Sequence, residues 1–541
     1  HRIRRSTAQE GRLIMMLSEA VSIARRFQRS IRLDTDIGTA DALAGFICHG
    51  STASVLETMA QLICESGQRV FTWTGPYGGG KSSLALALAC YISPDRKIRK
   101  AARKLLADVP HLAKALPASN TGWPTIPLTG HRGDPVADID AALTAAIAAK
   151  SRVRTKGTAD ARSVIARLDE QAVARRNGGV LLLIDEMGKY LEGAGDRGPD
   201  IHFFQELAES ANRSQGRFIV IGVLHQAFEQ YASRLGRESQ DEWAKVQGRY
   251  VDIPVVTVID EVIDLIGRAI VTDYAHPESL PIAKSLAVAI KRRRPGTPGD
   301  IAARLDRCWP LHPVTAALLG PVTRRSFGQN ERSTFGFLCS AEPEGLQDFL
   351  NGTTASSDAT YDPDRLWDYL RINLEPAILA SLDGHRWVQA AEAIERTEAK
   401  GTPLHIRLAK TIALIDLFRD GSGVTPENAT LHACLQGEPE DAIEEAIADL
   451  AEWSVIIFRK HLDAWSIYAG SDFDIDAAVS EARATTDLDF DRVTRLADLH
   501  PIPAKQHYHR TGTLRWFDTA ILPLSVAGDA VEAFKPTQGA A

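Results

Sequence analysis

An eight-residue stretch near the start of the chain matches the pattern GxxxxGK(S/T) completely: Gly75, Pro76, Tyr77, Gly78, Gly79, Gly80, Lys81 and Ser82. Its glycines allow backbone N–H groups to turn inward and surround phosphate groups. Lys81 would supply a positive charge to the terminal phosphates, and Ser82 would offer its hydroxyl to Mg²⁺. With Ser83 added as the next residue, the stretch predicts a binding site for a nucleoside triphosphate.

An apolar run that ends in two carboxylates is the expected partner of this loop. Residues 180–184 are Val-Leu-Leu-Leu-Ile, and Asp185 and Glu186 follow them directly. Such a run is typical of a central parallel strand, and ligands of α/β sheets bind at the carboxyl ends of the strands. We expect Asp185 to bind Mg²⁺ together with Ser82, and Glu186 to orient or deprotonate the attacking water. Glu186 and Lys81 are thus predicted to be catalytic.

A second apolar run, residues 217–223, is followed by Leu224, His225 and Gln226. If this run is a neighbouring strand, His225 lies at the same edge of the sheet and can sense the γ-phosphate. A polar residue that only caps the strand or faces solvent is an equally good interpretation.

The elements around these residues alternate between strand and helix patterns. Residues 69–74 predict a buried strand, and residues 81–92 predict a helix after the glycine-rich loop. Further patterns predict a strand at 124–128 and helices at 11–29, 51–64, 97–116, 134–150 and 201–212. Alternation of this kind predicts an α/β P-loop NTPase core, a parallel sheet flanked by helices.

After residue 260 helical patterns dominate, with a predicted loop at 291–299 and a predicted helix end at His312 and Pro313. In the last third, helices at 404–418 and 438–453 enclose a helix that Thr425 is expected to open, and two short strands follow at 454–459 and 463–468. This order predicts a winged helix. The predicted domains are a helical lead-in (1–60), the ATPase core (61–258), a helical lid (259–400), the winged helix (401–480) and a partial C-terminal region (481–541).

Composition excludes several classes of protein. The 541 residues are 44% hydrophobic and 24% charged, and no stretch approaches the roughly 18 apolar residues that a membrane-spanning helix needs. The six cysteines lie far apart, which supports neither a disulfide framework nor a zinc site. The net charge of −7 excludes a chain that coats nucleic acid by bulk charge. We expect a cytoplasmic protein without a secretory signal, whose native start precedes His1 because the first methionine is Met15.

These motifs and their order resemble the AAA+ and STAND branches of P-loop ATPases over roughly residues 60–475. Within them the chain is similar to origin-recognition-like ATPases and to large bacterial ATPases of phage-defence and DNA-modification systems, in stretches such as WTGPYGGGKSSLAL, IDEMGKYLE and FGQNERSTFGFL. The resemblance implies ATP and Mg²⁺ as cofactors and a homo-oligomer or multiprotein complex. It also implies an arginine finger and a sensor arginine, for which Arg332 is the first candidate and Arg324 and Arg325 are the others. His225 departs from the Asn or Thr usual at the sensor position.

Two functions of different classes fit these features. The first is an ATP-hydrolysing machine that acts with DNA or in defence, and the second is a nucleotide-gated signalling switch with slow hydrolysis. A kinase of small molecules is a weaker third. DNA binding is possible, but the third helix of the predicted winged helix has no Lys or Arg and seven acidic residues in and just before it, so phosphate repulsion opposes the usual docking: Glu438, Glu440, Asp441, Glu444, Glu445, Asp449 and Glu452. The wing edge at 459–461 is basic, and basic clusters at 291–294 and 505–510 could contact phosphates, although a solvated charged loop is the more frequent explanation for each of these two.

Overall fold

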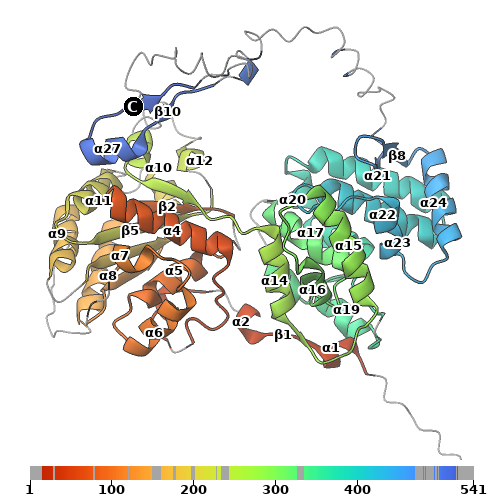
Figure 1. Ribbon diagram of the computed structural model, residues 1–541, viewed down its shortest axis with the longest axis horizontal. Helices are drawn as coiled ribbons and strands as arrows, with labels where there is room; N and C mark the ends of the chain where they lie inside the picture. Colours follow the sequence, from red (N-terminus) through yellow and green to blue (C-terminus); the bar gives the residue numbers. More distant parts are fainter. Residues whose placement is uncertain are drawn as a thin grey trace, which may run out of the picture.

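A five-stranded parallel sheet is the centre of the first half of the chain (Figure 1). The computed structural model describes residues 15–28, 31–39, 41–76, 79–117, 119, 121–148, 160–174, 178–195, 202–226, 228–232, 243–325, 334–356, 358–469, 499–519 and a few isolated positions. The strand order is β3-β4-β5-β2-β6. Their bounds are β2 Val70–Thr74, β3 Thr125–Thr129, β4 Val180–Asp185, β5 Phe218–Leu224 and β6 Val251–Pro254.

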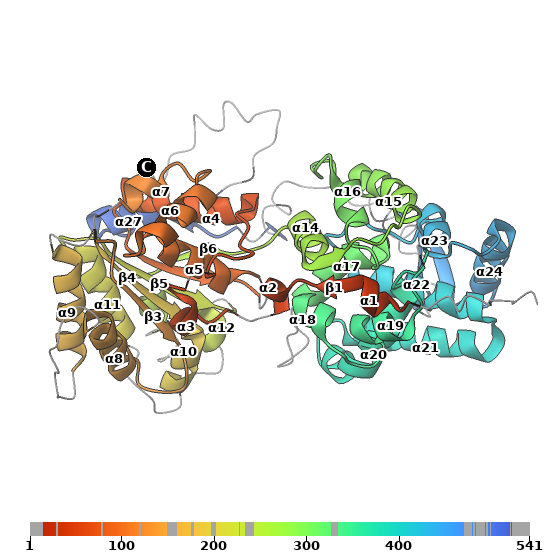
Figure 2. The same ribbon diagram turned by 90° about the horizontal axis from the view of Figure 1, so that it is seen from below.

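Helices cover both faces of this sheet because side chains of successive strand residues point to opposite sides. Phe71, Leu181 and Ile219 belong to one buried cluster, whereas their neighbours Val70 and Leu182 belong to the other. Figure 2 shows the two helical layers. The first contains α3 Leu33–Asp36, α4 Gly50–Glu65, α5 Lys81–Tyr91, α6 Arg96–Leu105 and α7 Leu112–Ala115; the second contains α8 Pro135–Ala148, α9 Ala161–Val173, α10 Met187–Gly195, α11 His202–Arg213 and α12 Phe228–Ala232.

This α/β lobe, residues 31–254, confirms the predicted P-loop NTPase core and corrects some of its elements. The helix expected at 97–116 is two helices, α6 and α7, separated by a turn at residues 106–111. Helix α9 and edge strand β6 were not predicted. β6 is short, and two of its four residues are exposed, so its sequence carries no continuous apolar signal.

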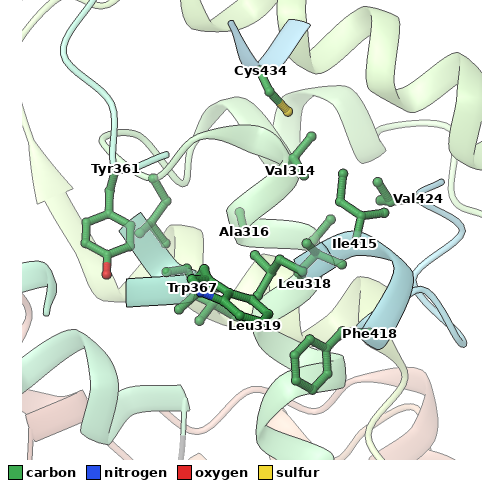
Figure 3. Close-up of a cluster of buried hydrophobic side chains, with 14 of the residues drawn as sticks. Val314, Ala316, Leu318, Leu319, Tyr361, Trp367, Ile415, Phe418, Val424 and Cys434 are labelled. Carbon is green, nitrogen blue, oxygen red and sulfur yellow. The ribbon is translucent and has the colours of Figure 1, made fainter. Parts of the chain in front are cut away.

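The second lobe is helical and comprises residues 15–28 and 258–469 (Figures 1 and 2). Its helix α17 is hydrophobic on all sides and therefore lies at the centre, where Figure 3 shows side chains of α17, α20 and α22 in one cluster. The helices before the winged helix are α14 Ile259–Ala269, α15 Ser279–Arg293, α16 Ile301–Asp306, α17 Pro313–Arg324, α18 Thr334–Cys339, α19 Leu346–Gly352, α20 Pro363–Leu379 and α21 Gly384–Lys400.

The winged helix follows in the predicted order. It consists of α22 Pro403–Phe418, α23 Asn428–Cys434, α24 Glu440–Glu452 and the antiparallel strands β8 Ile456–Arg459 and β9 Ala464–Ile467. One buried cluster extends from α14 to β9, so the lid and the winged helix share a hydrophobic core. The domain boundary at residue 400 stays a prediction.

Three sequence expectations in the helical lobe were wrong. Residues 291–293 end helix α15 and do not form a loop. His312 begins α17 as its N-cap, with its imidazole accepting from the Val314 N–H at 3.2 Å. Thr425 does not open α23, because Pro426 stays extended and its carbonyl accepts the Trp465 N–H of the wing at 3.0 Å.

The start of the described chain belongs to the helical lobe. Strand β1 (Val21–Ile23) pairs antiparallel with β7 (Ile270–Thr272), and the short helices α1 (Leu17–Ala20) and α2 (Arg25–Gln28) flank it. The expected helix at 11–29 is therefore interrupted by a strand, and its residues 11–14 and 29 lie outside the described residues. The chain reaches the α/β lobe only after this pairing.

Hydrogen bonds join the two lobes where helix α14 begins. The Glu261 carboxylate accepts from the Ser51 backbone N–H at 2.9 Å and also binds the Ser51 hydroxyl. Nearby, Arg294 holds Asp260 through two hydrogen bonds of 3.1 and 3.0 Å. These contacts fix the first turn of α14 against the start of α4.

The C-terminal segment returns to the α/β lobe. Helix α27 (Lys505–Thr511) lies over it in Figure 1, and Arg249 donates to the Tyr508 hydroxyl at 3.0 Å. A small hairpin of β10 (Ile502–Pro503) and β11 (Trp516–Phe517) flanks this helix. No helix in the described part of the chain is long and apolar enough to cross a membrane.

Two stacked tryptophans test the shared core of the helical lobe. Trp367 and Trp387 are buried, and their ring centroids lie 4.2 Å apart. Replacement of Trp367 by Ala should lower the free energy of unfolding by about 3–5 kcal/mol, since it leaves a large cavity. Ile372→Ala on the same helix is the control: its side chain is 58% exposed, and the change should be below about 0.5 kcal/mol. Denaturation followed by circular dichroism measures both. Equal stability of the two variants would contradict a tightly packed core.

Candidate nucleotide-binding site

The glycine-rich loop connects β2 to α5, as its motif requires. Gly75 packs so closely that a Cβ atom there would lie 2.3 Å from the Val255 carbonyl oxygen, and Gly80 has φ +78°, which favours glycine. The Gly79 N–H donates to the Pro76 carbonyl at 3.3 Å. Close packing therefore explains the glycine at position 75, and the left-handed backbone explains the glycine at position 80. Tyr77 and Gly78 lie outside the described residues.

Lys81 lies at the centre of the loop. Its side chain is almost completely buried, and its ammonium donates to the carbonyls of Gly75 and Pro76 at 2.6 Å each. Lys81 is also the first residue of α5, so Ser82 and Ser83 occupy the first turn of that helix. A helix N-terminus with a buried positive charge beside it attracts anionic phosphate groups.

Asp185, the last residue of β4, faces this loop across the edge of the sheet. Strand β5 lies between β2 and β4, so Asp185 reaches the loop across an intervening strand, and its carboxylate accepts from the Ser82 hydroxyl. It also accepts from the Glu186 N–H at 3.0 Å. Burial raises the pKa of Asp185, while the Ser82 hydroxyl and the charge of Lys81 oppose this shift. The two predicted metal ligands are thus in contact.

Glu186 has an uncommon backbone conformation. Its φ of +51° lies in the left-handed region, which costs free energy in a residue with a side chain. Its carbonyl packs against Gly130, where a Cβ atom would lie 2.3 Å away, and its carboxylate forms an ion pair with Lys189. The Glu186 carboxylate thus lies beside the start of α10, where Lys189 is its ionic partner.

His225 follows the last residue of β5, the strand between the loop and Asp185. Burial, together with the positive charges of Lys81 and Lys189, lowers the pKa of His225 to about 3. Its backbone N–H donates to the Tyr231 hydroxyl at 3.4 Å. The predicted position at the shared edge is therefore correct, and the side chain is a neutral imidazole at physiological pH.

The loop also contacts the segment that leads into the helical lobe. The Thr257 hydroxyl donates to the Gly79 carbonyl at 3.3 Å, and the Thr257 carbonyl accepts from the Arg324 guanidinium at the end of α17. Burial lowers the pKa of Arg324. Arg324 is therefore connected to the loop through Thr257, and its role as a sensor arginine stays a prediction.

The other two arginine candidates differ from Arg324. Arg325 forms ion pairs with Asp383 and, at 3.5 Å, with Asp420, and its guanidinium lies over the Phe418 ring. These contacts are all inside the helical lobe, so Arg325 stabilises that lobe and does not reach the loop. Arg332 lies outside the described residues, and its role as an arginine finger stays a prediction.

Three contributors were not predicted from the sequence: Gly130, Lys189 and Thr257. Gly130 directly follows β3 and therefore lies at the carboxyl edge of the sheet, where ligands of α/β proteins bind. Its position after a predicted strand could have indicated that it belongs to the site. Lys189 lies on α10, three residues after Glu186, and residues at this spacing are neighbours where the chain is helical. Thr257 carries no local signal, because its contact with Gly79 spans 178 residues.

The donor set fits Mg²⁺ and a triphosphate. Ser82 and Asp185 offer a hydroxyl and a carboxylate, the oxygen ligands that Mg²⁺ prefers, and it usually completes its shell with phosphates and water. The described residues contain no group of three or more His, Cys, Asp and Glu side chains placed to bind a metal, and all six cysteines are free.

No protein-family model and no curated protein matches the chain. Among solved structures it is similar to the ORC2 protein of Aeropyrum pernix in ADPNP–ADP complexes, with 10% identity and a TM-score of 0.32 over 83% of this chain and 99% of that one. The ADP form of that protein gives 11% identity and a TM-score of 0.31 over 85% and 97%. Drosophila ORC bound to DNA gives 13% identity and a TM-score of 0.27 over 81% and 100%. Similarities of this size do not define the activity of the chain.

The low pKa of His225 gives a testable dependence of stability on pH. In the folded protein His225 stays neutral down to a pH of about 3, whereas in the unfolded chain it takes up a proton below its usual pKa of about 6.5. The folded state is therefore progressively destabilised as the pH falls from about 6.5 towards 3. His225→Gln should lose less stability over this interval than the unmodified protein.

Thermal unfolding at a series of pH values measures this difference. His385→Gln, which changes an exposed histidine on α21, is the matched control and should follow the unmodified protein. If His225→Gln showed the same acid sensitivity as the control, the imidazole would not be buried beside the two lysines.

Proposed function

We propose that the chain binds ATP with Mg²⁺ and hydrolyses it to drive a multiprotein assembly associated with DNA or with antiviral defence. One observation carries the chemical part of this proposal. Lys81, Ser82 and the pair Asp185–Glu186 meet at a single edge of the parallel sheet, with Ser82 and Asp185 in hydrogen-bond contact. Phosphate binding, metal binding and water activation require these groups at one place.

The roles of the residues follow from their chemistry. The loop N–H groups and the start of α5 hold the phosphates, and the Lys81 ammonium offsets the negative charge that develops on the transferred group. Ser82 and Asp185 would hold Mg²⁺, which neutralises charge on the phosphate oxygens when bound. Glu186 orients the attacking water or accepts its proton. His225 donates or accepts a hydrogen bond as a neutral group near the terminal phosphate.

The acidic helix α24 supports a different biological role for the same ATPase core. Its apolar residues Ile443, Ile447 and Leu450 are buried, so its outer surface carries mainly carboxylates. Some contact neighbouring histidines, such as Glu444 with His432 at 2.8 Å. Because this surface would repel phosphates, the second candidate is a STAND-type switch in which nucleotide controls protein contacts without direct DNA binding.

The basic clusters give little further support for DNA binding. Of the residues at 291–294, Arg294 is paired with Asp260, Arg292 with Glu427 at 3.4 Å, and Arg293 donates to the Leu462 carbonyl at 2.7 Å. These arginines hold α15 against the rest of the lobe. The wing residues 459–461, helix α27 and the basic helix α6 remain as exposed basic segments among the described residues. Because the acidic α24 opposes the usual docking of a winged helix, we favour protein partners and self-association for the assembly.

The conversion of Glu186 to Gln tests the chemistry. ATP binding should persist, because Glu186 forms no hydrogen bond or ion pair with Ser82 or with the described residues of the loop. The rate of hydrolysis should fall by about 100- to 10,000-fold through loss of the general base. Calorimetric titration with a non-hydrolysable analogue and a phosphate-release assay measure the two quantities. Glu192→Gln, which changes a glutamate on α10 that is paired with Arg132 at 3.2 Å, is the control and should hydrolyse ATP normally.

The same assay with and without double-stranded DNA separates the two biological roles. Turnover that DNA strongly stimulates favours an ATP-driven machine, and slow turnover indifferent to DNA with retained ADP favours the switch. Hydrolysis by Glu186→Gln at the unmodified rate would contradict the assignment of the base.

Two adjacent arginines test the link between the lobes. Arg324→Ala removes the guanidinium that holds the segment beside Gly79 and should weaken ATP binding by about fivefold or more. Arg325→Ala is the matched control: it loses the ion pairs with Asp383 and Asp420, which should lower the melting temperature but leave ATP affinity unchanged. Equal ATP affinities in the two variants would show that Arg324 does not act on the loop.

A further inference from the structure

A cavity of about 230 Å³ lies in the helical lobe, remote in sequence from the nucleotide-binding residues. It is formed where the start of α21, the end of α22 and the two strands of the wing meet. Arg386, Arg419 and Arg459 line it together with Asp416, and Leu417 and Ile467 form part of an apolar wall. Each arginine comes from a different element, so only the folded lobe brings the three guanidinium groups together.

The charges in this cavity do not balance. Among the described residues that line it, Asp416 is the only carboxylate, and it lies 3.3 Å from Arg419 Nη1 and 3.9 Å from Arg386 Nη2. The Arg386 guanidinium also donates to the Asp416 carbonyl at 2.7 Å, which fixes its position. No ion pair of Arg459 occurs within the described ranges. The described lining thus contains three guanidinium groups and one carboxylate, an excess of two positive charges in a partly enclosed space. Asp420, outside the lining, also lies 4.0 Å from Arg419 Nε, but its side chain is 74% exposed and the pair is therefore weak.

Asp416 is itself held in place, so it cannot move to neutralise a third arginine. Its carboxylate accepts from the Ser466 hydroxyl of β9 at 3.3 Å, and its side chain is only 16% exposed. The side chains of Arg386 and Arg419 are 39% and 29% exposed, so their guanidinium groups remain accessible from solvent. The arrangement is a fixed positively charged pocket.

We propose that this cavity binds a small phosphorylated ligand, with its phosphate at Arg386, Arg419 and Arg459 and its less polar part against Leu417 and Ile467. A phosphate monoester carries about −1.5 to −2 charges at pH 7, which matches the excess charge of the lining. Guanidinium groups bind phosphate oxygens in pairs of hydrogen bonds. The site is distinct from the nucleotide site and does not depend on ATP hydrolysis.

The apolar wall favours a small molecule over a nucleic acid backbone. A phosphodiester that lies on a protein surface needs positive charge along its path, whereas this charge is confined to one cavity. The neighbouring helix α24 of the winged helix has an acidic outer surface, which would repel a long polyanion. A compact ligand with one phosphate and an apolar or aromatic part fits both the arginine side and the apolar side of the cavity.

Calorimetric titration of the full-length chain with inorganic phosphate and with adenosine 5′-monophosphate tests this proposal. The loop site is first saturated with Mg²⁺ and a non-hydrolysable ATP analogue. Adenosine 5′-monophosphate should bind more tightly than inorganic phosphate, and adenosine should not bind. Arg386→Gln and Arg459→Gln should each weaken the binding by about tenfold or more, as loss of a charge-assisted contact predicts.

Arg396→Gln is the matched control, because Arg396 is exposed on the same helix α21 and does not line the cavity. It should bind both probes as the unmodified protein does. Unchanged melting temperatures confirm that each variant is folded; Arg459→Lys, which keeps the charge, serves if Arg459→Gln unfolds and should retain part of the affinity.

Three results would overturn the proposal. One is the absence of saturable binding of both phosphate probes, and another is binding that the two cavity variants do not weaken. The third is binding of a short duplex DNA that depends on Arg386 and Arg459 while adenosine 5′-monophosphate does not compete, which would assign the arginines to a nucleic acid contact.

Discussion

Two charged groups buried at one edge of a sheet determine the arrangement of the nucleotide site. Lys81 and Asp185 are 4% and 6% exposed, and a charge in such surroundings is tolerated only with polar partners close to it. The loop supplies carbonyl groups to Lys81, and the start of α5 supplies the Ser82 hydroxyl to Asp185. The tight turn at Gly75 and the left-handed backbone at Gly80 follow from this requirement, because they direct the loop around the lysine.

The same requirement extends to the second lobe. The segment after β6 packs its Val255 carbonyl on Gly75 and its Thr257 hydroxyl on Gly79, and Arg324 holds that segment from α17. Since α17 lies at the centre of the helical lobe, the position of the loop and the packing of that lobe are connected through a short series of contacts. A site built only from the sheet would lack this connection to the remainder of the protein.

Local signals explain how much of the structure the sequence predicts. The loop, the strand that ends at Asp185 and the winged-helix order each arise from neighbouring residues, and all three are present. Strand β1 was not predicted because its partner β7 is about 250 residues away in sequence. Within the site, Thr257 and the strained backbone of Glu186 are consequences of packing and have no pattern of their own. Residues 291–293 show the reverse case, in which a basic run that suggests a loop is helical because its arginines have acidic partners.

The pairing of β1 with β7 has a mechanical consequence. The described chain starts in the helical lobe, crosses to the α/β lobe after α2, and crosses back between β6 and α14, so two of the covalent connections between the lobes lie at one junction. The segment 499–519, which lies on the α/β lobe again, adds a further connection elsewhere. A single connection would allow one lobe to swivel freely about the other. Two connections that leave the helical lobe close together restrict this rotation and favour bending about the line that joins them. The second of these connections contains Val255 and Thr257, which contact Gly75 and Gly79, so a displacement of the glycine-rich loop acts directly on the junction between the lobes.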